Sequence, residues 1–248
     1  MRDQGVGGGA GPRYGLLGGT FDPPHFAHLA LAQEARVRLG LDRVYFIPTG
    51  QSPHKLGRAV SRAADRRAMV ELAIAGEPRF ALLAVELERA GPSYTADTLR
   101  RLRAEWGSAA DVSLIVGWDM LVDLPHWREP DVIVGTADHV IAVRRPGYDE
   151  TADDLRVLAR ALPLLTPKLV VLEAPQLAIS ASMLRQRVAS GMPIRYFVPD
   201  DVARYIHDHG LYRPANRGLA AESHMVTGSG GMAGSTPVEP AAEREVGL

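Results

Sequence analysis

The chain has 248 residues, of which 46% are hydrophobic and 23% charged, so it is long enough to bury one complete core. Its formal net charge of -1 gives no reason to expect a nucleic acid or an anionic membrane as partner, and no run approaches the roughly 18 apolar residues of a membrane span. The absence of cysteine excludes disulfides, a thiolate nucleophile and cysteine-bound metals, and we expect a cytoplasmic protein that binds small ligands.

The two ends of the chain differ in composition from the part between them. Residues 1–12 are too glycine-rich to hold a fixed conformation alone, and they lack the Gly-Lys-Ser/Thr ending of a phosphate-binding loop. Residues 214–248 are rich in Gly, Ser, Ala and Glu and show no sustained apolar period. We therefore expect a disordered leader, a single folded domain over residues 13–213, and a disordered tail.

Between these ends, short runs rich in Val, Ile and Leu alternate with stretches of helical periodicity. The expected strands are Arg13–Leu17, Arg43–Ile47, Phe80–Leu87, Asp111–Val116, His139–Val143 and Lys168–Leu172. The expected helices are His25–Leu39, Ser61–Ala75, Thr95–Trp106, Asp153–Leu162, Ser180–Ser190 and Asp200–His209. Left-handed glycines are expected to close five of them, at Gly40, Gly76, Gly107, Gly191 and Gly210. The alternation predicts an α/β fold with a parallel sheet.

Ligands of such a sheet bind beyond the carboxyl ends of its strands, so the loop after Leu17 is a place to search. Two glycines open this loop, and His25 and His28 follow near a helix start. Their spacing puts both imidazoles on one helix face, beside free N–H groups that suit a phosphate. A surface pair or a chance spacing is the alternative, and a metal site is weaker because no third His is near and Asp22 precedes the helix.

The run Gly18-Gly19-Thr20-Phe21-Asp22-Pro23-Pro24-His25-Phe26-Ala27-His28-Leu29 resembles the signature of nucleotidyltransferases of the nicotinate-nucleotide adenylyltransferase type. Ala27 stands where the family's His-x-Gly-His motif usually has glycine. Further matches follow in order between Tyr14 and Tyr212: Phe46-Ile47-Pro48 through Pro53-His54-Lys55, Ser93-Tyr94-Thr95-Ala96-Asp97-Thr98-Leu99, Gly117-Trp118-Asp119 with Trp127, Arg144-Arg145-Pro146-Gly147, and Ile179-Ser180-Ala181-Ser182-Met183-Leu184-Arg185. Six ordered matches are far more specific than any one of them.

The resemblance implies a doubly wound parallel sheet, the Rossmann-like nucleotidyltransferase fold, in a single domain. It also implies adenylyl transfer from ATP to nicotinic acid mononucleotide, which gives nicotinic acid adenine dinucleotide and pyrophosphate, a step of NAD biosynthesis. Such a transfer needs position and positive charge more than covalent chemistry, and no residue looks like an activated nucleophile. Mg²⁺ is expected to be bound mainly through the ATP phosphates, with no dedicated protein metal site.

Roles carry over from the family by position. The expected ATP-binding residues are Gly18, Gly19, Thr20, Phe21, His25, His28, Gly117, Asp119, Ile179, Ser182 and Arg185. The expected catalytic residues are His28, His25, Lys55 and Arg185, and the expected nicotinate-nucleotide-binding residues are His54, Lys55, Thr95, Trp127 and Arg128. Trp127 would stack on the pyridine ring while the N–H groups of Thr95 and Arg128 receive its carboxylate.

Each of these roles has a plainer alternative. Arg185 suits a solvated position on an amphipathic helix, Asp119 suits a helix N-cap, and Trp127 suits a core position. The clusters Arg66-Arg67 and Arg100-Arg101-Arg103 are interpreted as solvated helix faces without function. Two other functions stay open: a related transferase for phosphopantetheine or a cytidylyl donor, and a non-catalytic nucleotide sensor. A homo-oligomer is possible.

Overall fold

The computed structural model describes residues 11–51, 60–144, 152–175 and 177–214. Its strands are β1 (Arg13–Gly19), β2 (Arg43–Pro48), β3 (Phe80–Leu82), β4 (Asp111–Gly117), β5 (His139–Val143) and β6 (Leu169–Leu172). Its helices are α1 (Phe26–Leu39), α2 (Ala63–Ile74), α3 (Thr95–Trp106), α4 (Trp118–Asp123), α5 (Pro130–Thr136), α6 (Ala152–Ala161), α7 (Ala181–Ala189) and α8 (Asp200–Asp208), with short 3-10 turns η2 (Leu124–His126) and η3 (Thr166–Lys168). The expected disordered leader and tail fall almost wholly outside the described residues and stay predictions.

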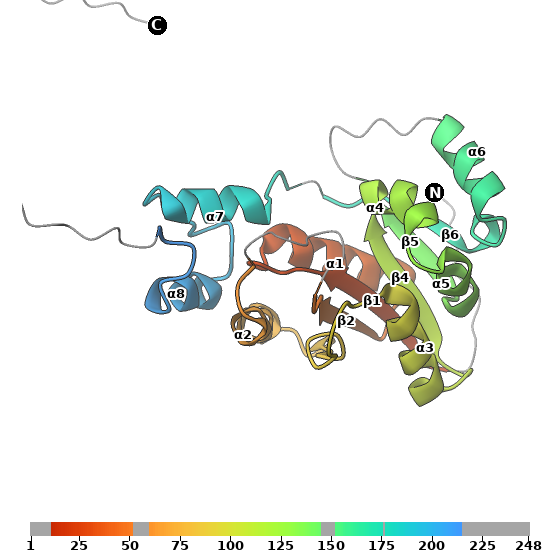
Figure 1. Cartoon of the computed structure of the whole chain (residues 1–248), viewed down its shortest axis with the longest axis horizontal. Coiled ribbons are helices and arrows are strands. Elements are labelled where there is room, and N and C mark those ends of the chain that lie inside the picture. The colour runs from red at the N-terminus through yellow and green to blue at the C-terminus, as the bar shows by residue number, and fades with distance from the viewer. Residues whose placement is uncertain (1–10, 52–59, 145–151, 176, 215–248) are drawn as a thin grey trace, which may run out of the picture. The chain divides into compact units, whose positions relative to one another are not determined.

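The strands form one six-stranded parallel sheet in the order β3-β2-β1-β4-β5-β6 (Figure 1). β1 pairs with β2 on one side and with β4 on the other, so the order of the chain reverses between β1 and β4. A crevice forms at such a switch point beyond the carboxyl ends of the two strands. The sheet therefore directs the search for a site to the loops after β1 and β4.

Successive residues of the central strands face opposite sides of the sheet, and each side has its own core. Leu16 and Leu114 pack with residues of α3 to α6, whereas Leu17 and Ile115 pack with residues of α1 and α2. The predicted doubly wound α/β fold is thereby confirmed. A third apolar cluster joins α2, α7 and α8, with Met69 at its α2 side. α7 and α8 lie together at one end of the fold in Figure 1.

Two predictions about elements were wrong. The strand expected at Phe80–Leu87 ends at Leu82, because this edge strand pairs only with β2 and the chain then turns inward to bury Val85 and Glu86. Gly76 is not left-handed, since α2 ends on Ala75 in the right-handed region and the chain leaves through a turn in which the Glu77 N–H bonds the Ile74 carbonyl. The other four glycines do have positive φ.

The helices α4 and α5 were not expected, because six or seven residues show too little of the helical period to reveal it. Among the described residues, no helix is long and apolar enough to cross a membrane.

Candidate active site

The first loop comprises residues 18–25, between β1 and α1, and its first two residues still belong to the sheet. β1 continues to Gly19, beyond the expected end at Leu17. A Cβ on Gly18 would meet nothing within 4 Å, so this backbone is open to a ligand, whereas a Cβ on Gly19 would lie 3.0–3.2 Å from the Phe21 ring. That ring is 2% exposed and packs against Phe46 in the core. Phe21 can therefore reach a nucleotide only through its backbone.

The two histidines lie together at the start of α1. His25 is the N-cap and is buried, and its ring stacks on the ring of His28 with 3.7 Å between centroids. The His25 N–H donates to His28 Nδ1 at 3.2 Å, which places the proton of a neutral His28 ring on Nε2. The edge of the Phe21 ring packs at 5.0 Å from the same imidazole. The orientation of His28 is thus set from two sides.

The first half of α7 contacts the first loop, although the two segments are far apart in the sequence. Ser180 caps α7, since its Oγ accepts from the Met183 N–H at 3.2 Å, and the Ser182 Oγ lies 3.1 Å from the Ser180 Oγ. Arg185 Nη1 donates to the backbone carbonyl of Asp22 at 2.7 Å. Arg185 is partly buried by this contact, which disfavours a merely solvated position. Ile179 packs against the third apolar cluster.

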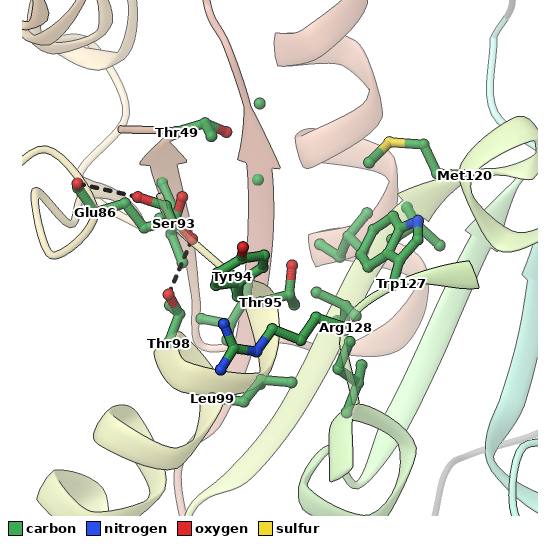
Figure 2. Close-up of a pocket in the computed structure, with 18 of the residues that line it drawn as sticks. Thr49, Glu86, Ser93, Tyr94, Thr95, Thr98, Leu99, Met120, Trp127 and Arg128 are labelled. Carbon is green, nitrogen blue, oxygen red and sulfur yellow. Dashed lines mark hydrogen bonds between the residues drawn. The ribbon is translucent and has the colours of Figure 1, made fainter. Parts of the chain in front are cut away.

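A cavity of about 470 Å³ opens beyond the carboxyl ends of β1, β2 and β4. Its polar and aromatic lining includes Gly18, Gly19, Thr20, Thr49, Glu86, Ser93, Tyr94, Thr95, Thr98, Asp119, Asp123, Trp127 and Arg128. Figure 2 shows Trp127 and Met120 toward one side of it, and Thr49, Glu86 and Ser93 toward the other. The Trp127 Nε1–H donates to Asp123 Oδ2 at 3.1 Å, which orients the indole. Trp127 is therefore a cavity wall and not only a core aromatic.

Helix α3 points its first turn into this cavity. Tyr94 is its N-cap, Thr95 is its first residue, and both line the cavity. The first N–H groups of a helix have no partner within it and carry the positive end of its dipole. Arg128 adds a cation at the same place, with its guanidinium 4.4 Å above the Tyr94 ring. This corner suits a small carboxylate.

Asp119, two residues beyond the carboxyl end of β4, also lines the cavity. The N-cap of α4 is Gly117, so the alternative of Asp119 as an N-cap is wrong. Its Oδ1 atom is buried and accepts no hydrogen bond from the residues that the structure describes. A buried acceptor of this kind costs free energy unless a ligand supplies a donor, such as a sugar hydroxyl.

The prediction that Arg66 lies on a solvated face was wrong. Arg66 is 3% exposed, and its guanidinium donates to the carbonyls of Thr20 at 3.0 Å, Thr49 at 2.6 Å and Ser61 at 3.2 Å. It therefore fastens the first loop to the loop after β2. The signal was in the sequence, because Arg66 stands three and four residues before Met69 and Val70, on the apolar face of α2.

Arg103 also departs from the predicted solvated face. Its guanidinium is half-buried, donates to the carbonyls of Ala110 and Thr136, and pairs with Asp138 at 2.6 Å. Arg103 therefore joins α3 to the segments just before β4 and β5, at the amino ends of these strands, and does not line the cavity. Arg100 is exposed and pairs with Glu129, as a surface residue would.

Glu86 was taken for a strand residue and proves to be a buried carboxyl of the cavity. Burial raises the pKa of Glu86, while the hydrogen bond from the Thr98 hydroxyl, 2.9 Å long, acts in the opposite direction. The Ser93 hydroxyl donates to its backbone carbonyl at 3.3 Å (Figure 2). Glu86 thus connects the turn after β3 to the start of α3, which no sequence period revealed.

Some predicted site residues lie outside the described residues, namely His54, Lys55 and Arg145 to Gly147. Arg144 is described and pairs with Glu173 at 3.0 Å. The cavity lining includes Gly18, Gly19, Thr20, Asp119, Thr95, Trp127 and Arg128 but not His25, His28, Ser182 or Arg185. The first loop joins these two groups, because Thr20 lines the cavity and Asp22 holds Arg185. Within the described ranges, no group of three or more His, Asp or Glu side chains is placed to hold a metal.

The chain resembles known proteins in sequence and in fold. The family model described as Cytidylyltransferase-like matches residues 16–187. A "Probable nicotinate-nucleotide adenylyltransferase" of Roseiflexus sp. (strain RS-1) is 48% identical over 199 residues, which cover 80% of this chain and 97% of that protein. One of the same name from Symbiobacterium thermophilum is 45% identical over 215 residues, covering 86% and 98%.

A solved structure has the same fold. It is that of Plasmodium falciparum nicotinic acid mononucleotide adenylyltransferase complexed with NaAD, which covers 81% of this chain and 97% of its own at a TM-score of 0.65 and 18% identity.

Proposed function

Because the chain belongs to the nicotinate-nucleotide adenylyltransferase family, we propose that it transfers the AMP part of ATP to nicotinic acid mononucleotide. The products are nicotinic acid adenine dinucleotide and pyrophosphate, and the reaction is a step of NAD biosynthesis. The observation that carries this proposal is the cavity at the switch point of the sheet, which combines an aromatic wall at Trp127 with the free first turn of α3 at Thr95.

The acceptor binds in this cavity. The pyridine ring stacks on Trp127, and the backbone N–H groups of Thr95 and Arg128 receive the ring carboxylate. Asp119 accepts from a ribose hydroxyl of the adenosine moiety, since its buried Oδ1 lacks a donor among the described residues. Gly18, Gly19, Thr20 and Gly117 bring backbone, rather than side chain, close to the nucleotide.

The triphosphate of ATP lies along the starts of α1 and α7. His25 and His28 donate to its phosphates, with His28 nearest the α-phosphate. Lys55, with His54, holds phosphate from the segment that follows β2 in the sequence. An oxygen of the acceptor phosphate attacks the α-phosphorus while the bond to the β-phosphate oxygen breaks. Ser182, Arg185 and the α7 dipole stabilise the negative charge on the departing pyrophosphate. The transfer takes one step, without a covalent enzyme intermediate.

Nucleotidyl transfer typically needs a divalent metal, and we propose Mg²⁺ for this chain. We expect phosphate oxygens and water to supply most of its ligands. Bound in this way, Mg²⁺ would neutralise charge on the triphosphate. The cytoplasmic location and a possible homo-oligomer stay predictions.

The test compares the products formed from several acceptors and two nucleotide donors. The full chain is incubated with MgATP and, in separate reactions, nicotinic acid mononucleotide, nicotinamide mononucleotide and phosphopantetheine. The same acceptors are then incubated with MgCTP in place of MgATP. Mass detection is expected to show the dinucleotide from MgATP and nicotinic acid mononucleotide as the main product. A main product from phosphopantetheine or CTP would assign the chain to another transferase of the superfamily, and no product with any pair would favour the nucleotide sensor.

A further inference from the structure

Asp22 is a buried junction between four distant segments of the chain. It is 2% exposed and lies in the first loop, between the glycines and His25. Its carboxylate accepts from the Tyr212 hydroxyl at 2.6 Å and from the Ser61 N–H at 3.2 Å. Its backbone carbonyl accepts from Arg185 at 2.7 Å. One residue therefore links the first loop to the start of α2, to α7 and to the segment after α8.

Tyr212 is held in place for this hydrogen bond. It packs on the third apolar cluster and adopts a φ of 63°, a left-handed conformation that a bulky residue rarely takes. Burial raises the pKa of Tyr212, so its hydroxyl stays protonated and donates throughout the working range of pH. The backbone strain at Tyr212 thus coincides with the hydrogen bond from its hydroxyl to Asp22.

We propose that Tyr212 is a positioning residue for adenylyl transfer, acting through Asp22 on the guanidinium of Arg185. The carboxylate of Asp22 is fixed by Tyr212, and the carbonyl of the same residue fixes Arg185. Without the hydroxyl, the carboxylate of Asp22 loses one of its hydrogen-bond donors. The backbone carbonyl of Asp22, which accepts from Arg185, is then held less firmly in position. This inference rests on the proposed role of Arg185 in holding the triphosphate.

The chain offers a matched control in Tyr205. The Tyr205 hydroxyl donates to the Asp65 carboxylate at 3.0 Å, which joins α8 to α2 just as Tyr212 joins the same end of the chain to the first loop. Asp65 also pairs with Arg62 at 2.9 Å. Within the part of the chain that the structure describes, neither Tyr205 nor Asp65 lines the cavity or has a hydrogen bond or ion pair with the first loop. Tyr205→Phe therefore removes a more exposed hydroxyl from the same cluster without touching Asp22.

The experiment compares Tyr212→Phe with Tyr205→Phe in the full chain. MgATP affinity is measured by calorimetry without an acceptor, and kcat with nicotinic acid mononucleotide. Tyr212→Phe is expected to weaken MgATP binding by roughly tenfold and to lower kcat, and Tyr205→Phe to change both by less than about twofold. Equal values for wild type and Tyr212→Phe would overturn the inference, and so would equal losses in both variants, which would indicate a purely structural effect.

A double-mutant cycle with Arg185→Met tests the route of the effect. Residues that act through one contact are not additive, so Tyr212→Phe is expected to add less than about twofold to the loss in Arg185→Met. Losses that multiply would overturn a route through Arg185. Because MgATP binding needs no acceptor, the affinity arm decides the inference even if nicotinic acid mononucleotide is not the substrate, an outcome that would count against the proposed function alone.

Discussion

His28 is oriented before any substrate arrives. Its Nδ1 accepts from the His25 N–H, and its ring lies between the rings of His25 and Phe21. If its Nε2 donates to charge that develops on the α-phosphate, His28→Ala loses a preorganised donor worth about 2.7–4 kcal/mol of barrier, and kcat falls by roughly a hundred- to a thousandfold. MgATP affinity changes much less. Steady-state kinetics and calorimetry on one sample measure both.

The same substitution also removes the acceptor at the start of α1, so stability needs its own control. His28→Gln retains a side-chain acceptor at the third helical position, where Gln commonly completes a capping box, but lacks the imidazole. It is expected to keep the melting temperature while losing kcat as His28→Ala does. Near-normal kcat in a destabilised His28→Ala would show that the residue only packs the helix.

Arg66 and Arg67 are neighbours in sequence with opposite surroundings. Arg66→Met removes a buried guanidinium that donates to the partly buried carbonyls of Thr20 and Thr49, and it is expected to cost about 3 kcal/mol of unfolding free energy. Arg67→Met breaks an exposed pair with Glu71 and is expected to change it by less than about 0.5 kcal/mol. Urea unfolding measures both. Equal losses would contradict the role of Arg66 in fastening the two loops.

Glu86 makes stability depend on pH. Because burial raises its pKa in the folded state, the folded chain holds a proton that the unfolded chain releases above the ordinary glutamate pKa of about 4.3. Its contribution to stability is full below that value and is lost as pH rises through the folded-state pKa. Glu86→Gln keeps an acceptor for Thr98 and is expected to gain stability relative to wild type as pH rises.

Urea unfolding between about pH 4.5 and 7.5 measures this gain. Glu88→Gln, at an exposed position two residues on, serves as the control and is expected to follow wild type. A Glu86→Gln variant that stays parallel to wild type across this range would show that the carboxyl titrates alike in both states.

At the scale of elements, we propose that the first turn of α3 sets the choice of acceptor. Backbone N–H donors suit the carboxylate of nicotinic acid mononucleotide, and they face the donors of an amide. Catalytic efficiency is expected to favour the acid over nicotinamide mononucleotide by at least roughly tenfold. Trp127→Ala, which removes stacking common to both rings, is expected to lower both efficiencies and keep their ratio. Equal efficiencies in wild type would contradict the assignment of Thr95 and Arg128.

Elements were predictable where local periodicity and burial agree. β4 and β5 are rich in Val, Ile, Leu and Ala, β1 contains Leu16 and Leu17, and α1 and α3 end at glycines, so sequence alone located them. β3 was overestimated because Val85 and Glu86 are buried by tertiary contacts outside the sheet, which a run of apolar letters cannot distinguish from a strand. Tertiary packing decided these positions.

At the scale of the whole molecule, the site joins residues far apart in the sequence. The motifs that resemble the family located the histidines, Thr95, Trp127 and Arg185 in advance. Arg66, Glu86 and Tyr212 were missed as contributors, because their partners are backbone carbonyls or side chains of other segments and leave no local pattern. Local pattern indicated the residues that are proposed to bind substrates, and only the fold revealed the residues that hold them in place.

The compact unit ends at Pro214, just beyond Tyr212. A chain ending at Pro214 is expected to keep kcat within about twofold and its melting temperature within about 2 °C, because the apolar packing of Leu211 and Tyr212 is retained. A chain ending at Gly210 lacks both residues and is expected to lose activity and several degrees. Thermal unfolding and turnover of both chains measure this. A large fall in melting temperature for the Pro214 chain would show that the later residues stabilise the fold.

The proposed reaction of the whole molecule is the transfer of AMP in one step from ATP to nicotinic acid mononucleotide. The most direct measurement supplies MgATP labelled at the α-phosphate, with the acceptor in excess, and follows label and pyrophosphate in one reaction. One-step transfer is expected to place the label in nicotinic acid adenine dinucleotide, to release one pyrophosphate for each dinucleotide, and to leave no label bound to the protein after denaturation. Label retained covalently on the protein, or pyrophosphate released without labelled dinucleotide, would contradict it.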